Sequence, residues 1–495
     1  MTQPVEFVEV ATRSGVVRGR WKETTGEGAN PRSAAFLGIP FAEPPIGDLR
    51  FQAPVKKEPW TGTLDALEFG ATAQRGDPGV TLIPEPSIPG ESTLNVNVFT
   101  PSPKKAEAGT GLPVLVWIHG GGYFAGSPAS PWYDGRNFNR DNVVTVTASY
   151  RLGFDGFGWV EGAPANRGVL DWMAALQWVQ DNIADFGGDP GRVTIAGQSA
   201  GGGAVLTLLG VEAAQDLFHQ VYAISSPIPD VSTEAAKEFA AKMAEKLGVS
   251  NDLAGFSSVS EEKLLEVQKE LSNLDPSQME KILKEGLSLG PVVDGTLIPR
   301  RTIDSIKKGV GADKHLVIGA TDDEFTMALA EMESKLKWVP KPLLLRQLGV
   351  PKKARKAYLA ANKDVVEAGN YRLGGRILTD RMFKVPMLEA IAARRNAPTW
   401  VYRFAWPSGT FGFAEHCLDV PFFFDCLDGP AMAPLAGDAP PQCLADELHH
   451  AAVQFIRTGD PGWPRYIKKD RVVRVWDVPS QDVPNGFASV YPLVG

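Results

Sequence analysis

The sequence predicts an α/β fold in which parallel strands lie buried between helices. Three runs, at 114–118, 143–149 and 193–196, are short and apolar along their length, as strands covered on both faces are. Between the last two runs, apolar residues recur at helical spacing over 169–183, and glycine and proline end this segment near 187–190. A helix followed by a strand in this way is typical of a βαβ arrangement.

The second half of the chain alternates between helical and strand patterns, and no linker divides it. The predicted elements are helices within about 233–283 and 341–395, strands at 315–319 and 400–405, and a last helix at 444–457. We therefore expect one domain, 1–495, with helix-rich excursions at about 230–290 and 325–395. The helices of the first excursion are expected to form a cap over the sheet.

Composition restricts the class of partner. The chain is 43% hydrophobic and 22% charged, which is ordinary for a globular protein, and its net charge of −8 argues against nucleic acid or an anionic membrane as partner. The three cysteines, Cys417, Cys426 and Cys443, are few and odd in number, which favours a reducing compartment. The N-terminus resembles no secretory signal, so we expect a cytoplasmic protein. The oligomeric state is left open.

The most informative motif is Gly-Gln-Ser-Ala-Gly at 197–201. It lies between the strand at 193–196 and a small-residue opening into an apolar helix at 202–209. A strand, a G-x-S-x-G turn and a helix form a nucleophile elbow, which presents the serine, here Ser199, above the sheet. The helix N-terminus beneath the serine favours developing negative charge. The motif is short, so the chemistry depends on whether partners for Ser199 exist.

A serine nucleophile needs a base and a third group that orients the base. Among six histidines, His416 alone is predicted in a loop, after the strand at 400–405, whereas His219 is predicted in a helix. The plain alternative is a solvated loop histidine. The acid of an α/β-hydrolase falls between serine and histidine in the chain, where Asp322, Asp323 and Glu324 follow a strand. A solvated acidic turn is the alternative for that run.

The sequence His-Gly-Gly-Gly-Tyr at 119–123 follows the strand at 114–118 and matches the glycine-rich oxyanion motif of esterases. A phosphate cradle is the alternative, but no helical pattern follows the glycines and no P-loop occurs. No cysteine and histidine pair has metal-ligand spacing. We therefore expect neither metal nor cofactor.

Ordered matches across nearly the whole chain resemble the type-B carboxylesterase family, which includes cholinesterases and bacterial ester hydrolases. The matching runs are 36–51, 117–123, 149–153, 182–190, 197–202, 416–422 and 458–461. The resemblance implies an α/β-hydrolase fold, with a large, mostly parallel central sheet flanked by helices and with helical excursions around an active-site gorge.

The resemblance also implies the roles of individual residues. These are Ser199 as nucleophile, Glu324 as acid, His416 as base, and the N–H groups of Gly121, Gly122 and Ala200 as oxyanion hole. Tyr123 and Phe124 adjoin the glycines and are candidate substrate contacts, with local packing as the alternative. The implied activity is hydrolysis of small to medium carboxylic esters through an acyl-enzyme. A carbamate or amide hydrolase is the alternative, and a non-catalytic scaffold is the least favoured reading.

Three departures from the family pattern refine these expectations. Ser92 and Thr93 stand where the family has aspartate and a disulfide cysteine, which supports a bacterial-type, cytoplasmic member. The loop at 75–90 contains no tryptophan to bind quaternary ammonium, so choline esters are not the expected substrates. Phe325 replaces the usual glycine after the acid, and Asp322 and Asp323 are expected to be exposed turn carboxylates.

Overall fold

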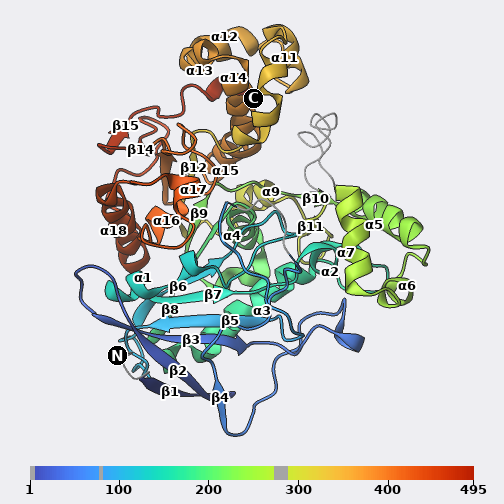
Figure 1. Cartoon of the computed structure of the whole chain (residues 1–495), viewed down its shortest axis with the longest axis vertical. Helices are drawn as coiled ribbons and strands as arrows, with labels where there is room; N and C mark the ends of the chain where they lie inside the picture. The colour runs from blue at the N-terminus through green and yellow to red at the C-terminus, as the bar shows by residue number, and fades with distance from the viewer. Residues whose placement is uncertain (1–5, 77–81, 273–287, 495) are drawn as a thin grey trace.

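The central feature of the molecule is a large mixed sheet (Figure 1), seen in a computed structural model that describes residues 6–76, 82–272 and 288–494. Within these residues thirteen strands form the sheet. Their order is β1 (Phe7–Thr12), β2 (Gly15–Glu23), β3 (Arg32–Pro40), β5 (Asn95–Thr100), β7 (Val144–Ala148), β6 (Leu112–Ile118), β8 (Gly188–Gln198), β9 (Gln220–Ile224), β12 (His315–Thr321), β13 (Thr399–Phe404), β14 (Val473–Trp476) and β15 (Gln481–Val483), with β4 (Thr63–Asp65) beside β2.

All strands from β7 to β14 pair in parallel, and antiparallel strands extend both edges. The buried runs predicted as strands correspond to β6, β7, β8, β12 and β13. The predicted α/β-hydrolase architecture, a large and mostly parallel sheet flanked by helices, is confirmed.

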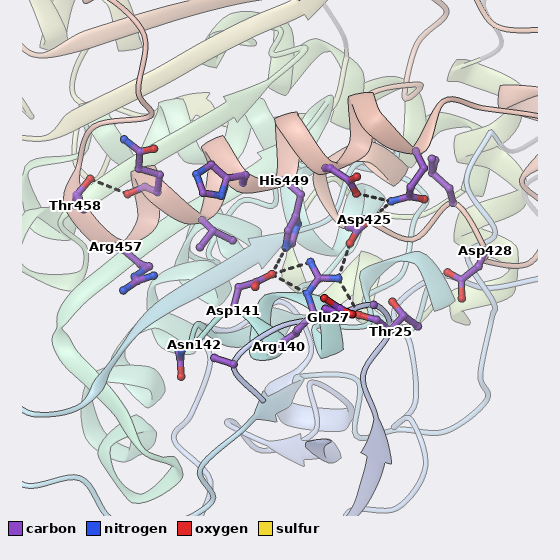
Figure 2. A pocket seen from close by; sticks show the side chains of 18 residues that line it. Thr25, Glu27, Arg140, Asp141, Asn142, Asp425, Asp428, His449, Arg457 and Thr458 are labelled. Carbon is purple, nitrogen blue, oxygen red and sulfur yellow. Dashed lines mark hydrogen bonds and ion pairs between the residues drawn. The ribbon is translucent and has the colours of Figure 1, made fainter. Parts of the chain in front are cut away.

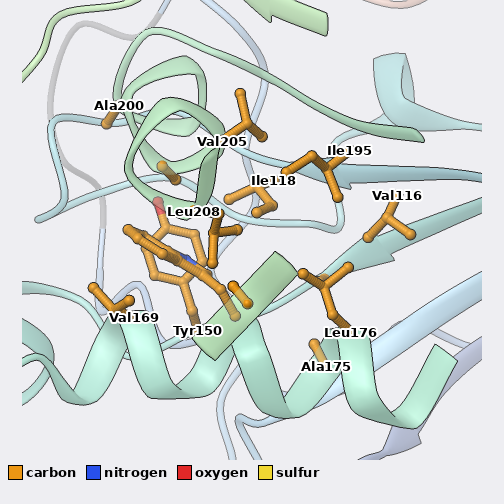
Figure 3. Close-up of a cluster of buried hydrophobic side chains, with 14 of the residues drawn as sticks. Val116, Ile118, Tyr150, Val169, Ala175, Leu176, Ile195, Ala200, Val205 and Leu208 are labelled. Carbon is orange, nitrogen blue, oxygen red and sulfur yellow. The ribbon is translucent and has the colours of Figure 1, made fainter. Parts of the chain in front are cut away.

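The side chains of β6 explain why its sequence is apolar without alternation. Val116 and Ile118 pack toward helices α3 (Arg167–Asn182) and α4 (Ala200–Gly210), whereas Leu115 and Trp117 belong to the core on the opposite face. That second face is covered by α16 (Val420–Phe423) and α18 (Gln442–Thr458). Figure 3 shows the first layer, with Val116, Ile118, Ile195, Val169, Leu176, Val205 and Leu208 in one cluster. Both faces of the strand are buried, so both need apolar side chains.

Helices occupy the two predicted excursions, and the part of the first at 273–287 lies outside the described residues. The first contains α5 (Thr233–Leu247), α6 (Leu253–Ser257) and α7 (Glu261–Ser272). The second contains α10 (Glu333–Leu336), α11 (Lys341–Gln347), α12 (Arg355–Ala361), α13 (Lys363–Ala368), α14 (Asn370–Thr379) and α15 (Val385–Ala393). Helices α11, α12 and α14 contribute side chains, among them Tyr358 and Leu373, to an apolar cluster separate from the core of the sheet. The two groups stand apart in Figure 1.

The remaining elements are short connections around the sheet. They include α1 (Arg136–Arg140), α2 (Gly153–Phe157), α9 (Thr302–Lys307), α17 (Ala433–Ala436) and the small sheet of β10 (Val231–Ser232) and β11 (Val292–Val293). None of the helices in the described part of the chain is both long and apolar enough to traverse a bilayer.

The turn from β8 into α4 brings the start of the helix close against the sheet. Ser199 has φ 56° and ψ −123°, a positive φ that side-chain-bearing residues rarely adopt. A Cβ on Gly201 would lie 2.0 Å from the carbonyl oxygen of Ile118, and one on Gly197 would lie 2.4 Å from the carbonyl carbon of Gly201. The glycines therefore let the helix start directly against β6 and β8.

We expect Gly201→Ala to lower the free energy of unfolding by about 3 kcal/mol, because the added methyl meets backbone atoms that cannot move aside. Gly210→Ala, at the other end of α4, is the matched control. Its Cβ would have no neighbour nearer than 3.4 Å, so this change should be neutral or slightly stabilising. Urea unfolding measures both changes. Equal stability of the two variants would contradict the packing argument.

Candidate active site

Ser199 is fixed by its backbone at the end of β8. Its N–H donates to the carbonyl oxygen of Ile224 (3.0 Å), and its own carbonyl accepts from the N–H of Gly203 (2.9 Å). The residue is half-buried, unlike its neighbours Gln198 and Ala200, which are buried. The elbow therefore presents one partly accessible side chain above the carboxyl end of the sheet.

His416 and Glu324 meet at the same edge, on loops that follow β13 and β12. The distance between His416 Nδ1 and Glu324 Oε2 is 2.5 Å, and both side chains are buried. The other carboxylate oxygen of Glu324 accepts a hydrogen bond from the N–H of Thr321 (2.8 Å). The backbone carbonyl of Glu324 accepts one from the N–H of His416 (3.1 Å). The acid and the imidazole are therefore held in one relative orientation.

The neighbouring carboxylates, Asp322 and Asp323, form ion pairs away from His416. The prediction that they are exposed turn residues is therefore wrong. Asp323 is 2% exposed and pairs with Arg372 and Arg376 of α14, at 3.1 Å each. The side chain of Asp322 is also largely buried and pairs with Arg403 (3.0 Å) and Lys384 (3.6 Å). Burial raises the pKa of Asp322, but the nearby cations, Arg403 and Lys384 first among them, lower it by more, so the net shift is downward. Of the three acidic side chains, Glu324 is the one that contacts His416.

Phe325, the departure from the family pattern, packs on the imidazole. The ring centroids of Phe325 and His416 are 4.8 Å apart, and Phe383 contacts both rings at 5.2 and 5.4 Å. The aromatic side chain therefore forms a wall beside the histidine and leaves its contact with Glu324 in place.

The glycine-rich loop after β6 lies beside Ser199. A Cβ on Gly120 would lie 3.3 Å from the Cβ of Ser199. Gly121 and Gly122 have φ of 101° and 61°, and a Cβ on Gly121 would lie 2.1 Å from the carbonyl oxygen of Ala125. None of the described residues accepts a hydrogen bond from the N–H of Gly121, Gly122 or Ala200. These three donors remain available to a ligand.

The two candidate substrate contacts differ in their surroundings. Tyr123 has no exposed surface and packs against Phe157 and Trp172, with ring centroids 5.1 and 6.1 Å away. This burial agrees with local packing, the alternative role of Tyr123, and its contact with substrate stays a prediction. Phe124 is 52% exposed and lies over Gly122, with its ring 2.5 Å from where a Cβ on that glycine would be.

Two other histidines, His119 and His219, have structural partners. His119 Nδ1 lies 2.8 Å from the carbonyl oxygen of Gly120, the ring stacks on Tyr150, and burial lowers its pKa to about 4. His219 was predicted in a helix but precedes β9 in a loop, where Nδ1 accepts from the N–H of Val193 (3.2 Å). His119, His219 and His416 thus all lie in loops, and of the three only His416 contacts Glu324.

A cavity of about 930 Å³ opens between α1, the turn near Thr25 and α18 (Figure 2). Among its charged groups, Arg140 pairs with Asp141 and Asp425 (2.8 Å each), and His449 lies 3.2 Å from Asp141. It is lined by different residues from those around Ser199, so its size is no indication of catalysis.

Two further side chains contact His416 and were not predicted as part of the site. The amide Nε2 of Gln198 lies 3.2 Å from His416 Nε2, and Glu415 Oε1 accepts from the His416 N–H (2.9 Å). Burial raises the pKa of Glu415 to about 8. Burial lowers the pKa of His416, but Cys417 and Glu324 raise it, and the net shift is upward. Gln198 lies within the G-x-S-x-G motif, but it occupies a variable position of that motif. The motif therefore gave no signal that its side chain contacts His416.

The sheet, the elbow at Ser199 and the loops after β12 and β13 define an α/β-hydrolase. Residues 6–479 match the model of the carboxylesterase family. The para-nitrobenzyl esterase of Bacillus subtilis (strain 168) is 32% identical over 491 residues, which are 94% of each protein. The cocaine esterase of Oryctolagus cuniculus is 32% identical over 505 residues, covering 94% of this chain and 91% of that protein.

Solved structures agree with these relatives. The carboxylesterase EST55 of Geobacillus stearothermophilus has a TM-score of 0.82 and 31% identity, covering 98% of this chain and 100% of its own. The chain therefore belongs to the carboxylesterase family, and it is a serine ester hydrolase that acts on small-molecule esters. The predicted family, enzyme class and reaction are confirmed.

Proposed function

We propose that Ser199, His416 and Glu324 are the nucleophile, base and acid of this carboxylesterase, and that the N–H groups of Gly121, Gly122 and Ala200 bind the oxyanion. The main support is the 2.5 Å contact between His416 and Glu324 at the strand edge where Ser199 lies. The unpaired N–H groups beside Ser199 supply the donors that an oxyanion requires.

In the proposed acylation, Ser199 Oγ attacks the ester carbonyl carbon while its proton moves to His416 Nε2. The carbonyl electron pair moves to oxygen, and the three N–H groups stabilise the resulting negative charge. Glu324 accepts the Nδ1–H bond and stabilises the imidazolium. The C–O bond to the alcohol then breaks, and the alcohol leaves with the proton from Nε2. Water repeats the sequence on the acyl-enzyme and releases the acid.

For the substrate, we propose small to medium esters whose acyl group contacts Phe124, since this exposed ring lies over Gly122. Carbamate or amide hydrolysis by the same groups is the second candidate. It is favoured by one relative, the phenmedipham hydrolase of Pseudarthrobacter oxydans, which is 32% identical over 471 residues. Rates on p-nitrophenyl esters of increasing acyl length, with a carbamate and an anilide in the same panel, decide between the two.

We place this activity in the cytoplasm without nucleic acid as a partner. All three cysteines are free, and two of them, Cys417 and Cys426, are buried, which fits a reducing compartment. The net charge of −8 disfavours a polyanionic partner.

Ser199→Ala tests the proposed nucleophile. We expect kcat/KM for p-nitrophenyl acetate to fall by about three orders of magnitude or more, because the acyl-enzyme can no longer form. Steady-state rates with and without EDTA are the measurement, and the wild-type rate should not respond to the chelator. A variant that keeps a tenth of the wild-type rate, or a wild-type enzyme that requires zinc, would contradict the proposal.

Glu324→Gln should affect mainly the rate, whereas Asp323→Asn should affect mainly the stability of the fold. The first removes the charge that stabilises the imidazolium, so we expect kcat/KM to fall about a hundredfold or more. The second breaks a buried pairing with Arg372 and Arg376 and should lower the free energy of unfolding by about 3 kcal/mol, with a small effect on rate.

Enzyme assays and urea unfolding on both variants make this comparison, with Asp364→Asn on exposed α13 as control for the loss of a carboxylate. If Asp323→Asn abolished the rate while Glu324→Gln stayed active, the assigned acid would be wrong.

Gly122→Val tests the oxyanion hole. The side chain would crowd the site at a residue with φ 61°, and loss of one N–H donor typically costs about 3 kcal/mol of transition-state stabilisation, or more than a hundredfold in kcat. Gly109→Val is the control for backbone strain, because Gly109 has φ 75° with no neighbour within 4 Å. Full kcat for Gly122→Val on an acetate ester would exclude the proposed donors.

A further inference from the structure

The side chain of Gln198 occupies the place beside His416 that the serine hydroxyl is proposed to use. Gln198 is the last residue of β8 and is 1% exposed, and its Nε2 lies 3.2 Å from His416 Nε2. Among the described residues, no hydrogen bond joins Ser199 Oγ to the imidazole. The amide is therefore the polar group that meets the catalytic edge of the ring in this state.

Gly120 leaves the space in which the carbonyl end of the Gln198 amide lies. A Cβ on Gly120 would lie 3.1 Å from Gln198 Oε1 and 2.9 Å from the Gln198 carbonyl oxygen, which is closer than real side chains pack. The carbonyl end of the amide thus lies over the glycine-rich loop, and the NH₂ end faces His416. An NH₂ group can only donate, so it pairs with a nitrogen that carries a lone pair.

This pairing selects one form of the histidine. Glu324 accepts a hydrogen bond from Nδ1–H, and Gln198 donates one to Nε2, so the two contacts together match the neutral ring with its proton on Nδ1. An imidazolium would place an N–H against the NH₂ of Gln198, and the two donors would repel. The neutral form is the one that can accept the proton of Ser199.

We propose that Gln198 is a positioning residue that favours the neutral form of His416, in the tautomer with its lone pair at Nε2. This inference rests on the proposed role of His416 as base. The hydroxyl of Ser199 first replaces the amide donor at Nε2 and then transfers its proton there as Oγ attacks the carbonyl carbon. The Nε2–H that forms later gives this proton to the leaving alcohol. No covalent bond to Gln198 forms or breaks.

The need for such a residue follows from the other groups around the ring. The titratable neighbours are Glu324 after β12, Glu415 and Cys417 beside it in the chain, and Asp419 at the start of α16. Carboxylates near an imidazole favour its protonated form, and the net shift in the pKa of His416 is upward. The Gln198 donor opposes them, since it stabilises the neutral ring alone.

Gln198→Glu is the sharpest test, because it keeps the shape and replaces the donor by a carboxylate that holds Nε2–H. Activity requires neutral His416, so the acidic limb of kcat/KM follows the pKa of this residue in the free enzyme. For the wild type we expect that limb above the ordinary imidazole value of about 6.5. In Gln198→Glu it should move up by about one pH unit or more, so that the rate at pH 6 falls at least tenfold relative to wild type. Near pH 9 the two rates should converge.

Gln198→Met removes the donor without adding charge and remains informative if the glutamate variant fails to fold. Its limb should also move up, by less than in Gln198→Glu. Gln481→Glu adds the same charge at exposed β15 and should leave the limb unchanged. In a Glu415→Gln background the shift caused by Gln198→Glu should persist, because the amide contacts the imidazole.

A role in packing alone would lower kcat/KM equally at every pH. The inference is overturned if the limb of Gln198→Glu stays within 0.3 pH unit of wild type, or if that of Gln198→Met fails to move up. It is also overturned if the shift disappears in the Glu415→Gln background. Failure of the proposed function looks different: His416→Ala would then keep its activity, whatever the behaviour of the Gln198 variants.

Discussion

The close contact of α4 with β6 and β8 is the constraint on which the rest of the site depends. Backbone meets backbone at Gly197 and Gly201, where no side chain would fit. This contact holds Ser199 at a positive φ that costs on the order of 1–3 kcal/mol on its own. The core on both faces of β6 supplies the rigidity that maintains the strained turn, so the serine is fixed before any substrate arrives.

The remaining groups are assembled by topology. The strand order β6–β8–β9–β12–β13 is parallel, so the loops that carry Gly121, Ser199, Glu324 and His416 all leave the same edge of the sheet. The second helical excursion has a part in this arrangement. Through Arg372 and Arg376, α14 binds Asp323 and so anchors the loop that presents Glu324. A helix of this excursion thereby also positions the acid.

Much of this could be predicted from the sequence because the relevant signals are local. Apolar runs identify buried strands, helical spacing identifies α3, and the glycines of 197–201 have few uses other than a sharp turn. The order of strands and helices then brings the loops together, as α/β topology requires. The assignments of β6, β8 and α18 agree with the structure to within a few residues at one or both ends.

What could not be predicted depends on contacts between distant segments. The burial of Asp323 follows from arginines about fifty residues later, and an acidic run by itself indicates exposure. Tyr123 turns into the core because its backbone has φ 67°, which nothing in the neighbouring sequence encodes. The contact between Gln198 and His416 joins residues 218 positions apart. In each case the partner is visible only once the chain is folded.

The most direct test of the account is to trap the acyl-enzyme. Wild-type enzyme mixed with a p-nitrophenyl ester and quenched within the first turnovers should gain the mass of one acyl group per chain. Peptide mapping should place that group on Ser199, with a matching burst of p-nitrophenol. A full turnover rate without any adduct under rapid quench, or an acyl group on another residue, would contradict the claim that this elbow carries the chemistry.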